Sequence, residues 1–244
     1  MNGRSNVRIS VFDDLKSLSN GAAELFRSLA HTAISVKGRF AVALSGGTTP
    51  RLLYTLLGSA PYRNTIDWPR VHLFWADERC VPADHPASNY GLVCDTLLES
   101  IPLPGSNVHN VQGEADPEEA ARAYEQIIKA FYGTATIPSF DLIILGVGVD
   151  GHTASLFPGS VSILEAARMA IPVYLEDPQV NRVTLTMTVI NHASHVLFLA
   201  SGRAKASVLQ NILYQGNSKG YPAGLVLPEN GTVTWFLDRE AAGR

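Results

Sequence analysis

The chain reads Leu145-Gly-Val-Gly-Val-Asp150-Gly-His152-Thr-Ala-Ser155-Leu-Phe-Pro158-Gly159 directly after an apolar run that is typical of a buried strand. Glycines, a carboxylate and an imidazole therefore follow the end of a strand, which is where open α/β sheets place their ligand sites. This stretch predicts an α/β fold with a functional turn after one of its inner strands.

The spacing of Gly146, Gly148 and Gly151 also fits a dinucleotide-binding fingerprint. That fingerprint requires a long helix after the third glycine and an acidic residue about 20 positions further on. Pro158 and Gly159 would interrupt such a helix early, and Glu165 comes too soon. Because the glycines equally allow a small anionic ligand to approach the backbone, we favour a small ligand over a dinucleotide.

Short apolar runs alternate with amphipathic segments along the rest of the chain. Because strands that are apolar on both faces and separated by helices form parallel sheets covered on both sides, we predict an open, mostly parallel, Rossmann-like sheet with helices on both faces. The predicted strands are Val7–Phe12, Phe40–Leu44, Val71–Trp75, Asp141–Leu145, Val183–Met187, Val196–Ala200 and Val233–Leu237. Helical stripes are predicted at Leu15, Leu18, Ala22, Leu25 and Leu29, with Asp13 as the N-cap, and at Ala120, Tyr124, Ile127 and Phe131.

Length and composition indicate one domain over residues 1–244, with room for a small embedded subdomain, because 46% of the residues are hydrophobic. The net charge of −3 gives no general attraction for nucleic acid. Neither a signal peptide nor a membrane span is recognisable, so we expect a cytoplasmic protein that does not bind membranes. The length permits a monomer or a weak homodimer. Cys80 and Cys94 have no zinc or redox spacing and are expected to be free thiols.

Ser45-Gly46-Gly47-Thr48-Thr49-Pro50 follows the predicted strand Phe40–Leu44. Thr49 is suited to cap a helix and Pro50 to open it. Glycines let successive backbone N–H groups converge, and the start of a helix adds partial positive charge, so a phosphate would fit here. A tight turn with a capped helix and no ligand is an equally good interpretation of this segment alone.

Asp77-Glu78-Arg79 follows the predicted strand Val71–Trp75. Such charges are costly to desolvate, so they either pair with each other or face a polar cleft. Arg79 could bind a carbonyl or phosphate oxygen, with Asp77 orienting it. The alternative is a solvated turn before a helix from Asn89 to Glu99, capped by Ser88.

His152 is the one histidine of seven that lies among glycines after a buried strand. A histidine can accept and return a proton near neutral pH, as hydrolysis requires, and Asp150 could support it from the same turn. An Asp-x-His pair could also bind a metal, but no further ligands have usable spacing, so we expect no metal. A structural histidine is the simpler alternative.

Two further cations lie beside predicted strands. Arg182 precedes Val183–Met187, and Lys205 lies in Ser201-Gly202-Arg203-Ala204-Lys205 after Val196–Ala200. A lysine in the first turn of a helix is disfavoured by the helix dipole unless an anion binds beside it. A solvated lysine there would cost only a few tenths of a kcal/mol, so this signal is weak by itself.

Together these segments resemble the 6-phosphogluconolactonase family almost from end to end. The matching motifs are Ser45–Pro50, Asp77–Pro82, His85, Ser88-Asn89, Gly146–Pro158, Arg182–Thr186, Gly202–Lys205 and Pro222-Ala223. The resemblance implies hydrolysis of 6-phospho-D-glucono-1,5-lactone to 6-phosphogluconate in the oxidative pentose phosphate pathway, without metal or organic cofactor.

By this resemblance, His152 is the general base that activates water or passes a proton to the departing ring oxygen. Catalytic roles fall to His152, Asp150 and Arg79, and substrate or phosphate binding to Ser45, Gly46, Gly47, Thr48, Asp77, Arg182 and Lys205. Which cation holds the phosphate and which the oxyanion stays open, as does the choice between Asp77 and Asp150 as the partner of His152.

The sequence leaves two other functions open. Glucosamine-6-phosphate deaminases resemble these enzymes and share the Gly-x-Gly-x-Asp-Gly-His core, but they continue with an acidic segment where this chain reads Thr153-Ala-Ser-Leu-Phe-Pro158. A non-catalytic phosphosugar sensor would use the same loops, but such proteins usually carry an added DNA-binding or partner domain, for which we expect no spare length here. An intact His152 and Asp150 also favour turnover.

Overall fold

The computed structural model describes residues 6–133, 137–176, 180–215 and 217–244 of the chain. Its centre is a seven-stranded sheet in the order β1-β10-β9-β6-β2-β3-β5, and all neighbouring strands run parallel. These strands are β1 (Val7–Phe12), β2 (Phe40–Leu44), β3 (Val71–Trp75), β5 (Val108–His109), β6 (Leu142–Leu145), β9 (His195–Ala200) and β10 (Thr232–Asp238). Every residue of β2 and β6 is buried, as expected for inner strands covered on both faces.

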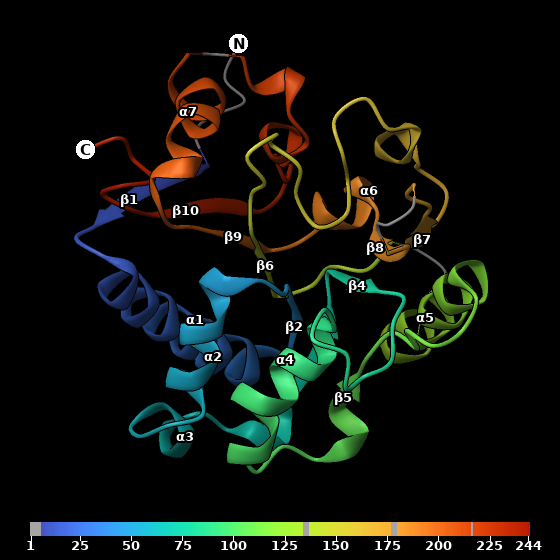
Figure 1. Ribbon diagram of the computed structural model, residues 1–244. Helices are drawn as coiled ribbons and strands as arrows, with labels where there is room; N and C mark the ends of the chain where they lie inside the picture. The colour runs from blue at the N-terminus through green and yellow to red at the C-terminus, as the bar shows by residue number, and fades with distance from the viewer. Residues whose placement is uncertain (1–5, 134–136, 177–179, 216) are drawn as a thin grey trace.

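The helices lie on both faces of this sheet. Figure 1 shows α1 and α2 on one side and α7 on the other. The helices are α1 (Leu15–Lys37), α2 (Thr48–Leu57), α3 (Tyr62–Thr65), α4 (Asn89–Thr96), α5 (Pro117–Tyr132), α6 (Met187–Ile190) and α7 (Ala206–Leu209), which continues as a π-helix over Gln210–Tyr214. The predicted open, mostly parallel α/β architecture is confirmed.

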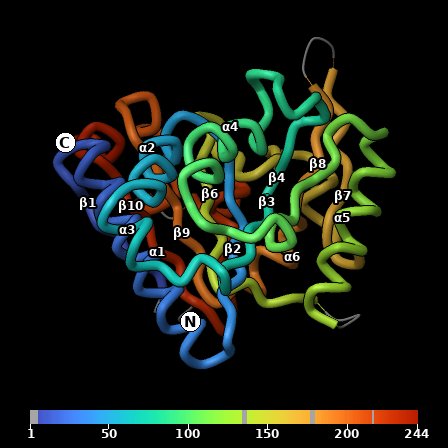
Figure 2. Tube along the Cα trace, turned by 90° about the horizontal axis from the view of Figure 1, so that it is seen from below, coloured from blue at the N-terminus to red at the C-terminus, as the bar shows by residue number. Residues whose placement is uncertain are grey.

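A second, smaller sheet has the order β4-β8-β7 and is antiparallel. It consists of β4 (Asp77–Arg79), β7 (Ala170–Val173) and β8 (Arg182–Leu185), and α5 packs beside β7 and β8 (Figure 2). The sequence placed the strand at Val183–Met187 in the parallel sheet, and this was wrong. That segment pairs with β4 and β7, and it ends early because the Thr186 side chain caps α6 by accepting from Val189 N–H.

Two predicted helix starts also differ from the structure. Asp14 rather than Asp13 caps α1, because its side chain accepts from Ser17 N–H at 2.7 Å. The start of α2 lies one residue before the predicted cap Thr49. Gly47 is the N-cap, with φ of +103°, a conformation that threonine would adopt only under strain.

The cap predicted for α4 is correct. Ser88 Oγ accepts from Gly91 N–H at 3.0 Å, although the α-helix ends at Thr96, before the predicted Glu99. A short 3₁₀ turn over Leu98–Ser100 follows.

The order of the large sheet reverses between β2 and β6. The chain moves outward from β2 to β3 and β5 on one side, and from β6 to β9 and β10 on the other. In open α/β sheets a crevice forms outside the carboxyl ends of the two strands at such a reversal. The loop at Ser45 follows β2 and the loop at Gly146 follows β6, so the topology brings two of the four predicted segments to this crevice.

Within the part of the chain that the structure describes, none of the helices combines the length and the apolar character that crossing a lipid bilayer requires.

Candidate active site

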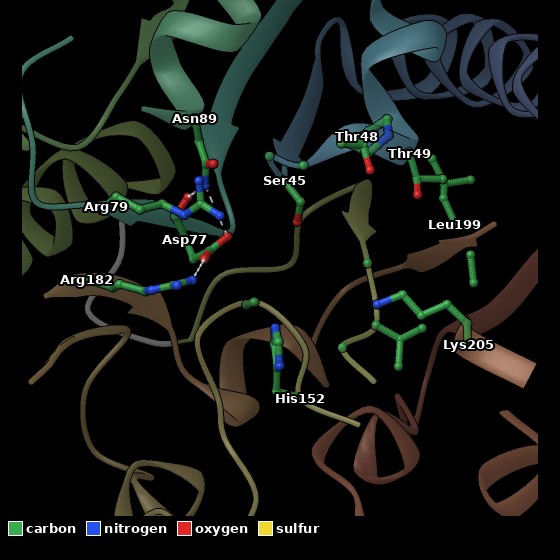
Figure 3. A pocket seen from close by; sticks show the side chains of 18 residues that line it. Ser45, Thr48, Thr49, Asp77, Arg79, Asn89, His152, Arg182, Leu199 and Lys205 are labelled. Carbon is green, nitrogen blue, oxygen red and sulfur yellow. Dashed lines mark hydrogen bonds and ion pairs between the residues drawn. The ribbon is translucent and has the colours of Figure 1, made fainter. Parts of the chain in front are cut away.

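A cavity of about 210 Å³ opens at this crevice. Figure 3 shows side chains from all four predicted segments pointing toward it. Its walls comprise Ser45–Pro50, Asp77, Arg79, Asn89, Gly146–Gly148, His152, Ala154, Arg182, Leu199, Ala200 and Lys205. Of the ten predicted site residues, nine therefore line one cavity, and Asp150 lies outside its lining.

The loop after β2 is anchored from two sides. Ser45 Oγ donates to the Ile144 carbonyl at 2.8 Å, which links β2 to β6, and the buried Tyr54 hydroxyl donates to the Ser45 carbonyl at 2.6 Å. Among the residues that the structure describes, no side chain caps the start of α2 at Gly47. The first N–H groups of α2 are therefore free for an anion, and the helix dipole adds partial positive charge there.

Asp77 is buried and contacts side chains from three other segments of the site. Its Oδ2 accepts the Ser155 hydroxyl at 2.7 Å and lies 4.0 Å from Arg182 Nη1, while Asn89 Nδ2 lies 3.4 Å from Oδ1. Its side chain is 7% exposed. Asp77 thus joins β4, β8, α4 and the histidine loop. It contacts Arg182 rather than Arg79, the partner considered from the sequence.

Glu78 points away from the cavity, as the alternation of side chains along β4 requires. Its carboxylate accepts from the backbone N–H groups of Arg79, Asn89 and Tyr90 at 2.6–2.7 Å. Burial raises the pKa of Glu78 to about 7, and the three N–H groups act against that rise. Glu78 therefore links β4 to the start of α4. It also fixes the backbone of Arg79 and Asn89, which both line the cavity.

Arg79 and Arg182 are direct partners across the β4–β8 pair. Arg79 Nη1 donates to the Ala87 carbonyl at 2.6 Å, and the Arg182 guanidinium lies 5.6 Å from the ring centre of Phe157. Burial lowers the pKa of Arg182, the charge of Arg79 adds to this, and Asp77 opposes it. Because arginine side chains are cationic, the register of β4 and β8 places two positive charges on one wall of the cavity.

His152 forms a pair with Asp150. The sequence alone left open whether Asp77 or Asp150 is the partner of this histidine. The distance from His152 Nδ1 to Asp150 Oδ1 is 2.6 Å, and the backbone N–H of His152 donates to the same oxygen at 3.2 Å. Burial acts to raise the pKa of Asp150, but these bonds and the charge of the imidazole outweigh it and leave the pKa lowered. Asp150 therefore stays ionised and engages Nδ1, while Nε2 has no protein partner among the described residues.

Gly148 makes room for this pair. A Cβ atom at Gly148 would lie 2.1 Å from His152 Nδ1 and 2.3 Å from Asp150 Oδ1. The loop is held by Thr153, whose hydroxyl donates to the Gly146 carbonyl at 2.8 Å, and Ala154 takes the left-handed conformation with φ of +48°. Non-glycine residues in this strained conformation are often found at functional sites, where the surrounding structure enforces it.

Lys205 ends a 3₁₀ turn over Arg203–Lys205, where the sequence predicted the first turn of an α-helix. The preceding turn is fixed by Asp238, which accepts from the Ser201 hydroxyl and from Gly202 N–H. In Figure 3 the lysine side chain lies on the Thr48 and Thr49 side of the cavity, across from Arg79 and Arg182. It forms no ion pair within the residues that the structure describes.

Sequence reasoning missed the role of Asn89 in lining the cavity. Asn89 is 1% exposed, and its Nδ2 donates to the Asp77 carbonyl at 2.8 Å, which fixes the orientation of the amide. Its Oδ1 is buried against Gly46, where a Cβ atom would lie 1.7 Å away. The spacing of Gly46 and Asn89 along the sequence gives no sign of this contact.

His85 does not line the cavity. Its Nδ1 accepts from Ala87 N–H at 3.1 Å, so it supports the loop that also holds Arg79. Arg51 and Arg203, which flank the phosphate-binding candidates, are likewise absent from the lining.

Fold and site together define a Rossmann-like α/β protein with a cationic, histidine-bearing crevice suited to a small anionic ligand. The chain matches the family model described as glucosamine-6-phosphate isomerases/6-phosphogluconolactonase over residues 13–235. This chain belongs to that family, as its sequence motifs suggested.

Individual relatives agree with this assignment. The chain is 39% identical to a rat (Rattus norvegicus) 6-phosphogluconolactonase and 40% identical to a human (Homo sapiens) 6-phosphogluconolactonase, with 96% of this chain and 92% of each relative covered. It is also similar to the solved structure of a 6-phosphogluconolactonase from Trypanosoma cruzi, with a TM-score of 0.87 and 33% identity. That match covers 97% of this chain and 96% of the other.

Proposed function

We propose that this protein hydrolyses 6-phospho-D-glucono-1,5-lactone to 6-phospho-D-gluconate, with His152 as the general base. The chain is an enzyme of the lactone hydrolase type, as its curated relatives indicate. The observation that carries the proposed mechanism is the Asp150–His152 pair, which leaves Nε2 free in a cavity that also holds two arginines and a lysine.

The proposed reaction begins when Nε2 of His152 removes a proton from a water molecule. The water oxygen then bonds to the lactone carbonyl carbon, and the carbonyl oxygen becomes an oxyanion. When this intermediate collapses, the bond between that carbon and the ring oxygen breaks, and His152 returns its proton to the ring oxygen. Asp150 holds the ring and stabilises the imidazolium between the two transfers, and such general base catalysis contributes about 10²–10⁴-fold.

Charge arrangement supports one orientation of the substrate. The start of α2 and Lys205 form one end of the cavity, where backbone N–H groups and an ammonium suit a phosphate. Arg79 and Arg182 form the other end, where two guanidinium groups suit the developing oxyanion. We therefore place the phosphate against Thr48 and Lys205, and the lactone carbonyl toward the arginines.

The cavity draws its residues from both sheets. Arg79 and Arg182 come from the small sheet, whereas His152 and Lys205 follow strands of the large one. We propose that residues 1–244 act as a single domain, because neither sheet alone would supply the site. A cytoplasmic location and a monomeric or weakly dimeric state stay predictions from the sequence.

The test is the rate of 6-phosphogluconate formation from freshly generated 6-phosphogluconolactone, read through a coupled dehydrogenase and compared with the uncatalysed rate. Acceleration over water is the expected result. Ammonia release from glucosamine 6-phosphate would instead indicate a deaminase. Binding of 6-phosphogluconate without any turnover would indicate a sensor, and either result would overturn the proposal.

A further inference from the structure

The segment after the π-helix returns to the histidine loop. Ala223 N–H, in a 3₁₀ turn over Pro222–Leu225, donates to the Gly151 carbonyl at 3.0 Å. The ring of Tyr221 lies against Gly151, because a Cβ atom there would be 2.3 Å from Tyr221 Cδ1 and 2.8 Å from its Cγ. In Figure 1 this orange-to-red segment borders the yellow loop that follows β6. Residues about 70 positions apart thus form one packed unit.

Tyr221 is itself held in place. Asn211, in the π-helix, donates from Nδ2 to the Tyr221 hydroxyl at 3.2 Å. Gly224 N–H donates to the Tyr221 carbonyl at 2.9 Å, and Tyr221 N–H donates to the Ser218 carbonyl at 3.2 Å. Hydrogen bonds at its hydroxyl, its carbonyl and its N–H therefore hold the Tyr221 ring against Gly151.

Gly151 connects the two residues of the proposed catalytic pair. It has φ of +82°, its N–H donates to the Gly148 carbonyl at 3.0 Å, and Gly148 N–H donates to the His152 carbonyl at 2.8 Å. The Asp150–His152 pair occupies the space beside Gly148, and Tyr221 occupies the space beside Gly151. The turn is therefore confined on both sides. Without the Tyr221 ring, the wide backbone freedom of Gly151 would let the Asp150 carboxylate and the His152 imidazole move relative to each other.

We propose that Tyr221 is a positioning residue that fixes the Gly151 turn and so maintains the hydrogen bond between Asp150 and His152. This inference rests on the proposed role of His152 in lactone hydrolysis. Tyr221 does not line the cavity, so it acts through the loop and not on the substrate. Its apolar ring supplies the support, and its hydroxyl supplies only the bond to Asn211.

The test compares Tyr221→Ala and Tyr221→Phe with a matched control, Tyr214→Ala, which changes a 47% exposed tyrosine in the neighbouring π-helix. We expect Tyr221→Ala to lower kcat about tenfold to a hundredfold with KM changed less than twofold, since misplacing a catalytic group by about 1 Å costs up to a hundredfold. Tyr221→Phe should restore most of kcat, and Tyr214→Ala should match the wild type.

A second readout is independent of turnover. The ¹⁵N chemical shifts of the His152 ring, assigned with His152→Ala, report whether Nδ1 carries the proton bound to Asp150. They should change in Tyr221→Ala and stay in Tyr221→Phe. A folded Tyr221→Ala protein with wild-type kcat and wild-type shifts would overturn the proposal, and so would equal losses in the Ala and Phe variants.

If Tyr221→Ala does not fold, Tyr221→Leu replaces it, with the same expected loss and the same overturning result. If the wild-type protein proves inactive on the lactone, the chemical shifts alone decide. A change in Tyr221→Ala would then uphold the positioning of His152 while the proposed reaction fails, and unchanged shifts would overturn both.

Discussion

Ser155 donates its hydroxyl proton to Asp77 Oδ2 over 2.7 Å, and this bond joins the histidine loop to β4 across 78 positions of the chain. Both residues are buried, with overall exposures of 0% for Ser155 and 5% for Asp77. The bond therefore couples the loop that carries His152 to the strand that carries Arg79.

Ser155→Ala should destabilise the protein, because the Asp77 carboxylate would lose a buried donor. We expect a loss of about 1–3 kcal/mol in the free energy of unfolding, measured by urea titration. Ser106→Ala is the control, since Ser106 makes only a weak 3.4 Å contact with Asn107. Equal stability of the two variants would contradict the coupling.

His152→Ala should reduce turnover a hundredfold or more, since the proposed general base would be lost. The fold should persist, because the side chain is 31% exposed and contributes little to the core. Steady-state kinetics with the coupled dehydrogenase and circular dichroism check both points. His31→Ala, an exposed histidine on α1, serves as the control with expected wild-type kinetics.

Gly148→Ala should separate Asp150 from His152, because the new Cβ atom would overlap both side chains. We expect at least a tenfold fall in kcat with smaller effects on KM, as for a change that displaces the proposed base without touching the proposed phosphate site. Gly105→Ala is the matched control, since a Cβ atom there meets nothing within 4 Å. Retained kcat in Gly148→Ala would argue that the pair is not needed.

Lys205→Ala should raise KM about tenfold to a hundredfold with little change in kcat. The proposed contact of Lys205 with the phosphate would stabilise the bound substrate and the transition state alike, and a charged hydrogen bond stabilises by about 1.5–3 kcal/mol. Lys16→Ala, an exposed lysine on α1, controls for the loss of one charge. A fall in kcat at constant KM would refute the phosphate role and point to Lys205 as a transition-state contact.

Two partly buried histidines should lower the free energy of unfolding in mild acid, and Glu78, whose pKa is raised, acts in the opposite direction. Burial lowers the pKa of His109 and of His195 to about 4, with His72 and Arg8 respectively adding to the effect. Both rings stay neutral in the folded protein, whereas an unfolded histidine titrates near 6.5. The unfolded state therefore binds protons first, so the stabilisation is complete above pH 6.5 and is lost as the pH falls toward 4.

Urea unfolding between pH 7 and pH 4.5 measures this slope, which is at most ~1.4 kcal/mol per pH unit for each histidine and smaller for rings that water reaches. His109→Phe keeps the ring that stacks on Phe74 at 4.3 Å and should flatten the slope. His31→Ala should leave the slope unchanged. An unaltered slope in His109→Phe would show that other groups govern the acid response.

Most of the parallel sheet could be predicted because strands such as β2, β6 and β9 are short apolar runs. Six of the seven predicted strands lie in it at nearly the predicted residues. Three strands were not predicted. β5 has two residues, β4 is the charged triplet Asp77–Arg79, and β7 contains Pro172. Their pairing depends on partners far along the chain, which local patterns do not encode.

The candidate site could be predicted where a motif follows a strand, and nine of the ten predicted residues line one cavity. The roles of Asn89 and Gly148 could not. Asn89 contacts Gly46 and Asp77, which lie elsewhere in the sequence, and the crowding at Gly148 depends on how its own loop folds back on itself. The choice of Asp150 as the partner of His152 likewise required the geometry of the turn. The sequence thus predicts which side chains line the cavity. Which of these side chains contact each other depends on tertiary packing.

The register that makes Arg79 and Arg182 neighbours has a consequence for the resting protein. Like charges opposite each other on paired strands repel, so the small sheet is under electrostatic tension while no anion is bound. Any oxyanion that settles between the two guanidinium groups relieves that tension and stabilises the fold, by about 2.7 kcal/mol at a concentration of 100 times its Kd. Occupancy of the crevice and heat resistance are thus thermodynamically linked. A protein saturated with the proposed phosphosugar ligand should therefore resist heat better than an empty one, because the ligand adds negative charge to the partial compensation that Asp77 already gives Arg182.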